Sequence, residues 1–117
     1  IHFGYLDKMH ELTITENILN QSLSEAKKHQ AKTIKKINLL VGEATGIVPD
    51  SVQFYFATLK QKTIAKDAIL VIKTIPLVLC CPKCKIEYQG FDAPCNCRAG
   101  MEIVSGQELL IESLEIE

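Results

Sequence analysis

The sequence predicts an α+β fold, in which a small mixed β-sheet with two helices carries an inserted, zinc-ribbon-like lobe with four cysteine ligands. Three observations predict this class. Two stretches have helical periodicity, others have the alternating or continuous apolar pattern of strands, and five cysteines gather between Cys80 and Cys97. At 117 residues the chain suits one small domain that bears a smaller module.

The first helix is predicted from about Leu12 to the basic run that ends at His29. Its apolar residues recur at helical spacing and form one stripe: Ile14, Ile18, Leu19, Leu23 and Ala26. Thr13 and Glu16 have the spacing of a capping box, and a start one or two residues earlier also fits the pattern. The basic run places positive charge in the last turn, where the helix dipole favours it.

A strand and a second helix are predicted next. Between residues 33 and 42, Ile37, Leu39 and Val41 alternate with polar residues, which is typical of a half-buried strand. Pro49 suits the first position of a helix, where its missing N–H costs nothing. The residues expected on the buried face of that helix are Val52, Tyr55, Phe56 and Leu59.

Two strand-like stretches flank the cysteines. The first, residues 68–79, contains Pro76, which indicates an edge position or a bulge. The second, residues 101–116, is divided by Gly106, and its expected core residues are Leu110, Leu114 and Ile116. Because both flanks are strand-like, we expect the lobe to begin and end in one small sheet.

Charge and motifs argue against several function classes. The 13 basic and 14 acidic residues give a net charge of −1, which argues against a nucleic-acid-binding surface. No apolar run reaches the about 20 residues that span a bilayer, and no signal peptide is visible, so we expect no membrane partner and a cytoplasmic location. The sequence holds no Ser/His/Asp set, phosphate-binding glycine loop or paired acid/base carboxylates, so we expect that the protein is not an enzyme.

The cysteine spacing indicates a metal. Cys81 and Cys84 bracket a C-P-x-C turn, and Cys95 and Cys97 supply a second pair. Four thiolates satisfy tetrahedral Zn²⁺ and leave no position for water, as in structural sites. Cys80 is a fifth thiol and could replace one of these ligands, since C-x-C is a tighter spacing than C-x-x-C. The alternatives are reduced or partly disulfide-linked thiols and a C-x-x-C redox centre, which normally lies at a helix N-terminus that this context lacks.

Met9, His10 and Glu11 stand just before the first helical stripe. A lone histidine there is more often a surface or capping residue than a ligand, but His10 would be residue two if translation began at Met9. The order of Met-His-Glu, amphipathic helix, the stretch INLLVGEATGIVPDSVQFYF, the C-P-x-C turn, a second cysteine pair and the closing GQELLIESLEIE resembles the HypA family of hydrogenase maturation proteins. The resemblance runs from Met9 to the C-terminus.

The resemblance implies a nickel metallochaperone that serves [NiFe]-hydrogenase, with urease as an additional destination. It implies His10 as the principal Ni²⁺ ligand, assisted by Met9 and Glu11. The structural Zn²⁺ ligands that it implies are Cys81, Cys84, Cys95 and Cys97. The GTPase HypB and the hydrogenase large subunit would be its partners, and the chain would be a monomer or a homodimer.

The predicted organisation has three parts: a leader or tag-like extension (1–8), an α+β nickel-binding domain (9–79 with 101–117) and a zinc-binding lobe (80–100). The chain departs from the family pattern in its second cysteine pair, which is usually C-x-x-C, and in the extension before Met9. That extension replaces a free amine with an amide, so it predicts weaker nickel binding than a chain starting at Met9. The alternative function is a zinc-ribbon module for protein or nucleic-acid interaction without a nickel role.

Overall fold

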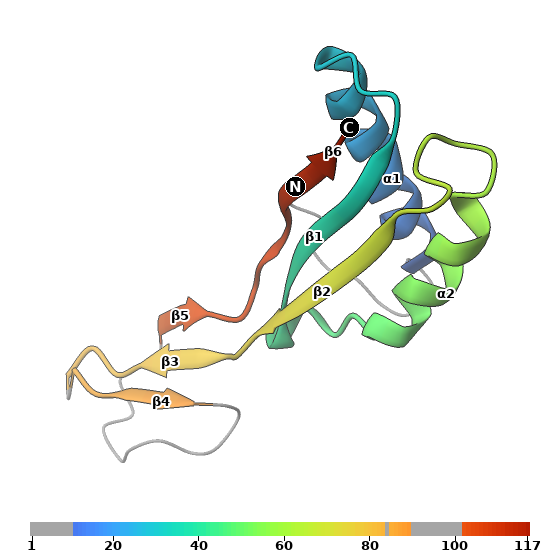
Figure 1. Ribbon diagram of the computed structural model, residues 1–117. Coiled ribbons are helices and arrows are strands. Elements are labelled where there is room, and N and C mark those ends of the chain that lie inside the picture. Colours follow the sequence, from blue (N-terminus) through green and yellow to red (C-terminus); the bar gives the residue numbers. More distant parts are fainter. Residues whose placement is uncertain (1–10, 84, 90–101) are drawn as a thin grey trace.

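The computed structural model describes residues 11–83, 85–89 and 102–117. These residues form two α-helices, a short 3₁₀ turn and two three-stranded sheets (Figure 1). The helices and the 3₁₀ turn are α1 (Glu11–Lys28), η2 (Glu43–Thr45) and α2 (Pro49–Leu59). The strands are β1 (Ile34–Gly42), β2 (Ile69–Ile75), β3 (Val78–Cys80), β4 (Glu87–Gln89), β5 (Glu102–Ser105) and β6 (Leu109–Ile116). The predicted α+β class, with two helices and mixed strand pairing, is confirmed.

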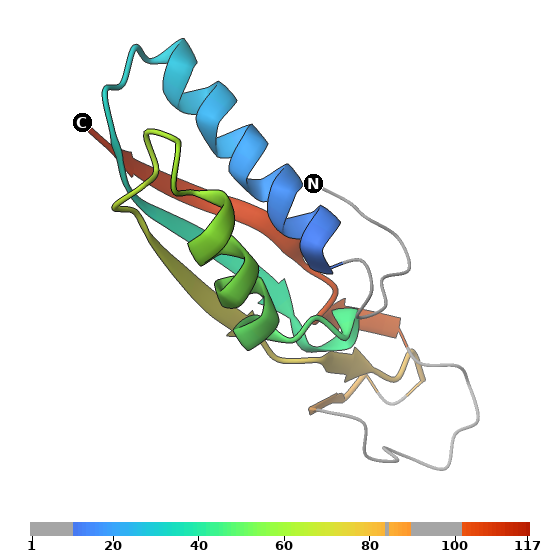
Figure 2. The same ribbon diagram turned by 90° about the vertical axis from the view of Figure 1, so that its right-hand side faces the viewer.

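The first sheet has the order β2-β1-β6. Strand β1 pairs in parallel with β2 and antiparallel with β6, so the sheet is mixed. A parallel neighbour needs a crossover, and α2 supplies it between β1 and β2. Both helices lie against the same face of this sheet (Figure 2). The sheet and the two helices together are called the α/β body below.

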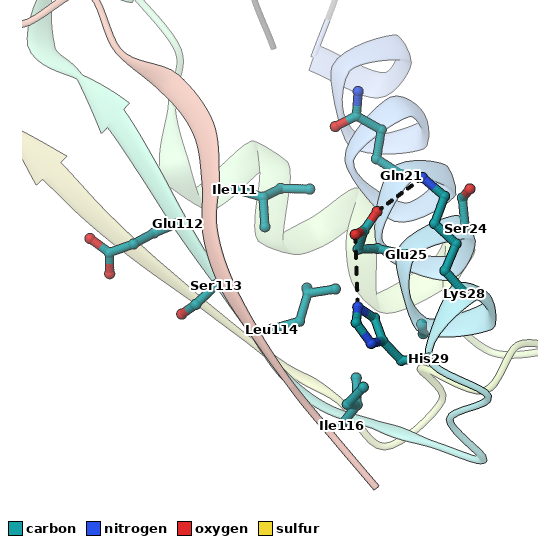
Figure 3. Close-up of a pocket in the computed structure, with 11 residues that line it drawn as sticks. Gln21, Ser24, Glu25, Lys28, His29, Ile111, Glu112, Ser113, Leu114 and Ile116 are labelled. Atoms are coloured by element: carbon teal, nitrogen blue, oxygen red, sulfur yellow. Dashed lines mark ion pairs between the residues drawn. The ribbon is translucent and has the colours of Figure 1, made fainter.

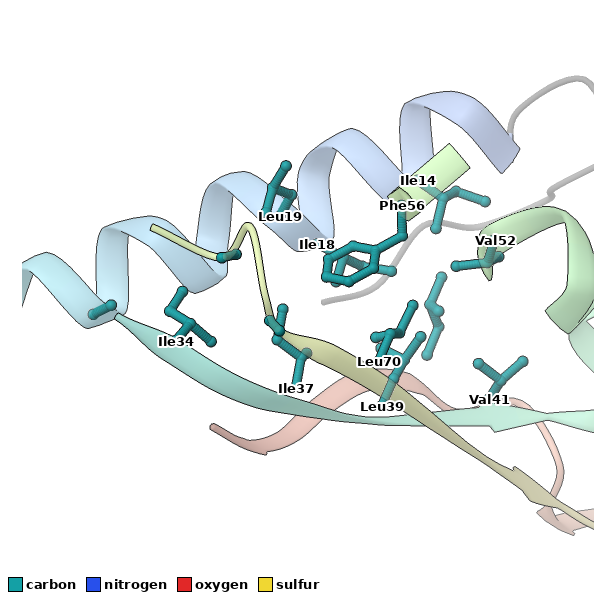
Figure 4. Close-up of a cluster of buried hydrophobic side chains, with 14 residues drawn as sticks. Ile14, Ile18, Leu19, Ile34, Ile37, Leu39, Val41, Val52, Phe56 and Leu70 are labelled. Carbon is teal, nitrogen blue, oxygen red and sulfur yellow. The ribbon is translucent and has the colours of Figure 1, made fainter. Parts of the chain in front are cut away.

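The core of the α/β body lies between the helices and the first sheet (Figure 4). Ile37, Leu39 and Val41 of β1 are almost fully buried, as their alternation predicts. The helices contribute Ile14, Ile18, Leu19, Ala26, Val52 and Phe56. Each helix buries one face only, and no helix among the described residues is both long and apolar enough to cross a bilayer.

Helix α1 begins at Glu11, two residues before the threonine of the predicted capping box. Thr13 is exposed and lies inside the helix, so it is not the capping residue. Thr15 instead donates its hydroxyl to the carbonyl oxygen of Glu11 at 2.7 Å. The acidic side chain of Glu11 suits the first turn, where the helix dipole favours negative charge.

Strand β6 places different residues in the core from those expected. Leu109 is buried, whereas Leu110 lies opposite Leu40, outside the core, and Ile116 is 36% exposed. A register shift opposite Asn38 and Leu39 inserts one extra residue in β6, which changes the phase of its alternation and turns Leu110 out of the core. A second register shift lies between Ile34 and Lys36, next to the pairing of Ile34 with Ile116. The prediction of Leu114 as a core contributor is confirmed, since it packs against the cluster.

The second sheet has the order β4-β3-β5, and it extends from one end of the α/β body (Figure 1). Residues 76 and 77 separate β2 from β3, so the proline lies between strands of different sheets. Strand β3 leads into the cysteine block and β5 follows it, and the two pair directly and antiparallel. The segment between them therefore begins and ends in one small sheet, as expected.

Candidate metal centre

Of the three residues predicted to hold nickel, the structure describes Glu11; Met9 and His10 lie outside the described residues. Glu11 opens α1 and is only 2% exposed. Its carboxylate oxygen Oε2 accepts a hydrogen bond from the backbone N–H of Val48 at 2.8 Å. Val48 directly precedes α2 and occupies its N-cap position. The start of α1 is thus tied to the start of α2.

This contact is electrostatically favourable. The first N–H groups of a helix lack intrahelical partners and carry partial positive charge. Val48 offers α2 no side-chain cap, and Pro49 follows it at the first helical position. The carboxylate of Glu11 therefore supplies negative charge at two helix N-termini, its own and that of α2.

Cys81, the first residue of the C-P-x-C sequence, lies between β3 and β4 at the start of a tight turn. The Lys85 N–H donates to the carbonyl oxygen of Cys81 at 2.7 Å, and the Cys81 N–H donates to that of Ile86 at 3.2 Å. Lys85 has a positive φ of 57°, which closes the turn. Cys81 is fully buried although both residues after it are exposed. A tight turn that holds a buried cysteine at its first position fits one half of a zinc–thiolate site.

The remaining predicted zinc ligands, Cys84, Cys95 and Cys97, lie outside the described residues. Cys80 ends β3, is half-buried and donates its thiol to the carbonyl oxygen of Cys81 at 3.8 Å. Within residues 11–83, 85–89 and 102–117, no three His, Cys, Asp or Glu side chains converge on one point. The metal ligand sets stay predictions from the sequence.

The segment between β1 and α2 contacts both regions that carry predicted ligands. At its start, the carboxylate of Glu43 accepts a hydrogen bond from the Leu77 N–H at 2.6 Å, next to β3. The Ala44 N–H donates to the carbonyl oxygen of Gly106 at 2.7 Å, next to β5. At its end, Val48 holds Glu11. The sequence reading missed these supporting contacts.

A groove of about 640 Å³ lies between the second half of α1 and β6 (Figure 3). On its helical side Glu25 pairs with Lys28 at 3.5 Å and with His29 at 4.0 Å. The His29 side chain is 64% exposed, as expected for a solvated residue in the last turn. None of the residues predicted to bind a metal lines this groove.

A comparison with known protein families agrees with the resemblance seen in the order of the sequence motifs. A sequence profile described as HypA, "Hydrogenase/urease nickel incorporation, metallochaperone", matches residues 9–116. The chain belongs to the HypA family. The resemblance predicted from the Met-His-Glu start, the C-P-x-C turn and the closing strand is confirmed.

Curated members of the HypA family match most of the chain. The hydrogenase maturation factor HypA of Dehalococcoides mccartyi is 38% identical over 93% of this chain and 95% of its own length. That of Caldanaerobacter subterraneus subsp. tengcongensis is 35% identical over 93% of this chain and all of its own length.

Solved HypA structures have the same fold. A solution structure of the Ni metallochaperone HypA from Helicobacter pylori covers 91% of this chain and 96% of its own, with a TM-score of 0.66 and 24% identity. A second solution structure of a HypA protein covers 95% and 98%, with a TM-score of 0.71 and 24% identity. The second sheet and its cysteine turn are consistent with the HypA fold.

Proposed function

We propose that this chain carries Ni(II) as cargo for the maturation of [NiFe]-hydrogenase, with urease as a further destination. The observation that carries the proposal is the HypA profile match across residues 9–116, which begins at the Met-His-Glu sequence. A carrier must release its ion, so an exposed site with few side-chain ligands suits delivery better than a closed cage.

His10 is the principal nickel ligand in this proposal. Ni²⁺ accepts square-planar nitrogen coordination. The imidazole, the backbone nitrogen of His10 and neighbouring backbone nitrogens, including that of Glu11, can close small chelate rings around such an ion. As the first residue of α1, Glu11 has an N–H outside the intrahelical hydrogen-bond ladder, which leaves that nitrogen available. Met9 assists through its backbone nitrogen, which is a free amine only when the chain starts there.

The zinc ion in this proposal is permanent and structural. Its ligands are Cys81, Cys84, Cys95 and Cys97, with Cys80 as the substitute if the C-x-C pair cannot place both sulfurs. The support is the tight turn around the buried Cys81 and the chemistry of four thiolates in one short lobe. The lobe of residues 80–100 is the zinc module, and residues 9–79 with 101–117 form the nickel domain.

The partners in this proposal belong to the nickel-delivery machinery. They are the GTPase HypB and the hydrogenase large subunit, which act in the cytoplasm with a monomeric or homodimeric carrier. The chain itself is a carrier and not a catalyst.

The deciding experiment compares His10→Ala with His29→Ala, since His29 is an exposed histidine in the same chain. Nickel and zinc per chain are measured after nickel loading, in the full chain and in a chain starting at Met9. We expect one retained zinc in every form, loss of nickel in His10→Ala only, and tighter nickel binding by the chain that starts at Met9. Normal nickel uptake by His10→Ala would overturn the proposal in favour of a zinc-ribbon interaction module.

A further inference from the structure

We infer that Glu11 is a positioning residue whose carboxylate holds the start of α1 against the start of α2, and that it does not ligate nickel through its side chain. The inference rests on the proposed nickel function and assigns a separate role to one member of the Met-His-Glu sequence. Its basis is the hydrogen bond from the Val48 N–H to Oε2 of Glu11, at 2.8 Å.

The burial of Glu11 shows that its carboxylate belongs to the folded domain. Glu11 is 2% exposed, and it is the acidic residue among the buried polar residues that the structure describes. A carboxylate is costly to bury unless hydrogen bonds or opposite charge compensate it. No ion pair reaches Glu11 from the described residues, so the compensation comes from the Val48 N–H and the positive ends of two helices.

Two contacts, one to the backbone and one to the side chain of Glu11, lie at the start of α1. The Thr15 hydroxyl binds the backbone carbonyl of Glu11 at 2.7 Å, and the Val48 N–H binds its side chain. His10 is covalently attached to this fixed point. If the carboxylate moved to a metal ion, the Val48 N–H would lose its partner and the link between α1 and α2 would break. The carboxylate is buried and one of its two oxygens is occupied by the Val48 N–H, so we assign it to positioning, and the Glu11 variants below test whether its other oxygen ligates nickel.

The test uses two variants of Glu11 and one of its partner in the full chain. Glu11→Gln keeps a carbonyl oxygen that can accept from Val48, whereas Glu11→Ala removes the acceptor. Val48→Pro removes the donor N–H instead, at a residue whose φ of −92° must shift somewhat to reach the value of about −65° that proline prefers. Nickel affinity and the Ni(II) d–d absorption band are measured by titration with nickel sulfate. We expect Glu11→Gln to stay within about twofold of the original chain, and Glu11→Ala and Val48→Pro to bind about tenfold more weakly.

The absorption band separates positioning from ligation. In all three variants the band should keep its position, because the nitrogen ligands are unchanged. If the carboxylate ligates nickel, Glu11→Gln will lose as much affinity as Glu11→Ala and the band will shift, which overturns the inference. If Val48→Pro does not fold, the contrast between the two Glu11 variants decides alone.

Two controls keep the outcomes distinct. Ser22→Ala removes another buried hydrogen bond of α1, from the Ser22 hydroxyl to the Ile18 carbonyl at 2.8 Å, so it should lower the thermal stability without changing nickel affinity. His10→Ala tests the proposed function itself. If His10→Ala loses nickel while Glu11→Ala binds as tightly as the original chain, the positioning role fails and the nickel function stands.

Discussion

The two sheets of this molecule are stabilised in different ways. The α/β body has a continuous core made by both helices and all three strands of the first sheet. In the second sheet and its cysteine turn, Cys81 is the one buried side chain among the described residues. Ile86, Ile103 and Val104 there are 52%, 47% and 53% exposed. Hydrophobic burial can therefore fold the body, whereas the described residues of the second sheet and its turn bury too little apolar surface to fold by this means.

This contrast gives a physical reason for the proposal that one small chain binds a permanent zinc ion as well as a transient nickel ion. A module with almost no apolar core requires another source of free energy, and small domains obtain it from disulfides or a metal. A structural zinc ion contributes on the order of 10 kcal/mol or more. The start of α1 needs no such contribution, because Glu11 already joins it to the start of α2 in the packed body.

Removal of zinc should have the largest effect, and it should be confined to the lobe. Cys84→Ser removes one thiolate, so we expect the protein to lose its zinc. The lobe would then lose the stabilisation that zinc contributes, on the order of 10 kcal/mol. Metal content and amide chemical shifts measure this, and the signals of α1, β1 and α2 should persist. Collapse of those signals together with the lobe would show that the two regions fold as one unit.

Truncation of a buried isoleucine should show the opposite pattern. Ile37→Ala creates a cavity in β1, where the side chain is fully buried, and should lower the free energy of unfolding by about 2–5 kcal/mol. Ile103→Ala is the matched control, because it removes the same atoms from a strand residue that is 47% exposed. It should cost about 0.5 kcal/mol. Urea denaturation of zinc-loaded protein measures both, and equal losses would contradict the proposed difference between the sheets.

The sequence predicts the elements of the α/β body better than the burial of each residue in them, because local periodicity alone decides which face of an element is expected to be buried. Ile37, Leu39 and Val41 alternate without interruption, so their burial follows directly from the pattern. The closing strand breaks this rule. Its inward residues are Leu109, Ile111 and Leu114, a spacing that only an extra residue in the strand explains. A bulge depends on pairing with another strand and cannot be found from local periodicity. The expectation was therefore that every second residue of this strand faces the core.

The candidate site, like the fold, has parts that the sequence predicts and parts that it does not. The cysteine turn and the Met-His-Glu sequence are local motifs that sequence reading finds, and their ligand roles stay predictions. The contacts that hold these motifs join residues far apart in the chain: Glu11 to Val48 and Glu43 to Leu77. In each pair a carboxylate binds a backbone N–H, and a backbone donor carries no residue type that a pattern can reveal. The signal available was an acidic residue directly after Gly42 at the end of a strand.

The junction between body and lobe gives the smallest effect of the three and the finest test of their connection. A Cβ added to Gly42 would lie 2.1 Å from the backbone carbonyl of Gly106, next to β5, whereas one added to Gly46 meets nothing within 4 Å. Gly42→Ala should therefore separate the two backbones and cost about 1–3 kcal/mol.

Gly46→Ala is the control for this last substitution. Gly46 has a φ of +74°, so alanine there should cost about 1 kcal/mol through backbone strain alone. Urea denaturation gives the two losses, and hydrogen exchange at the Ala44 amide, which donates to the Gly106 carbonyl at 2.7 Å, reports the junction itself. Faster exchange in Gly42→Ala but not in Gly46→Ala is expected. Equal exchange in both would mean that the lobe is attached through its strands and not through this close approach.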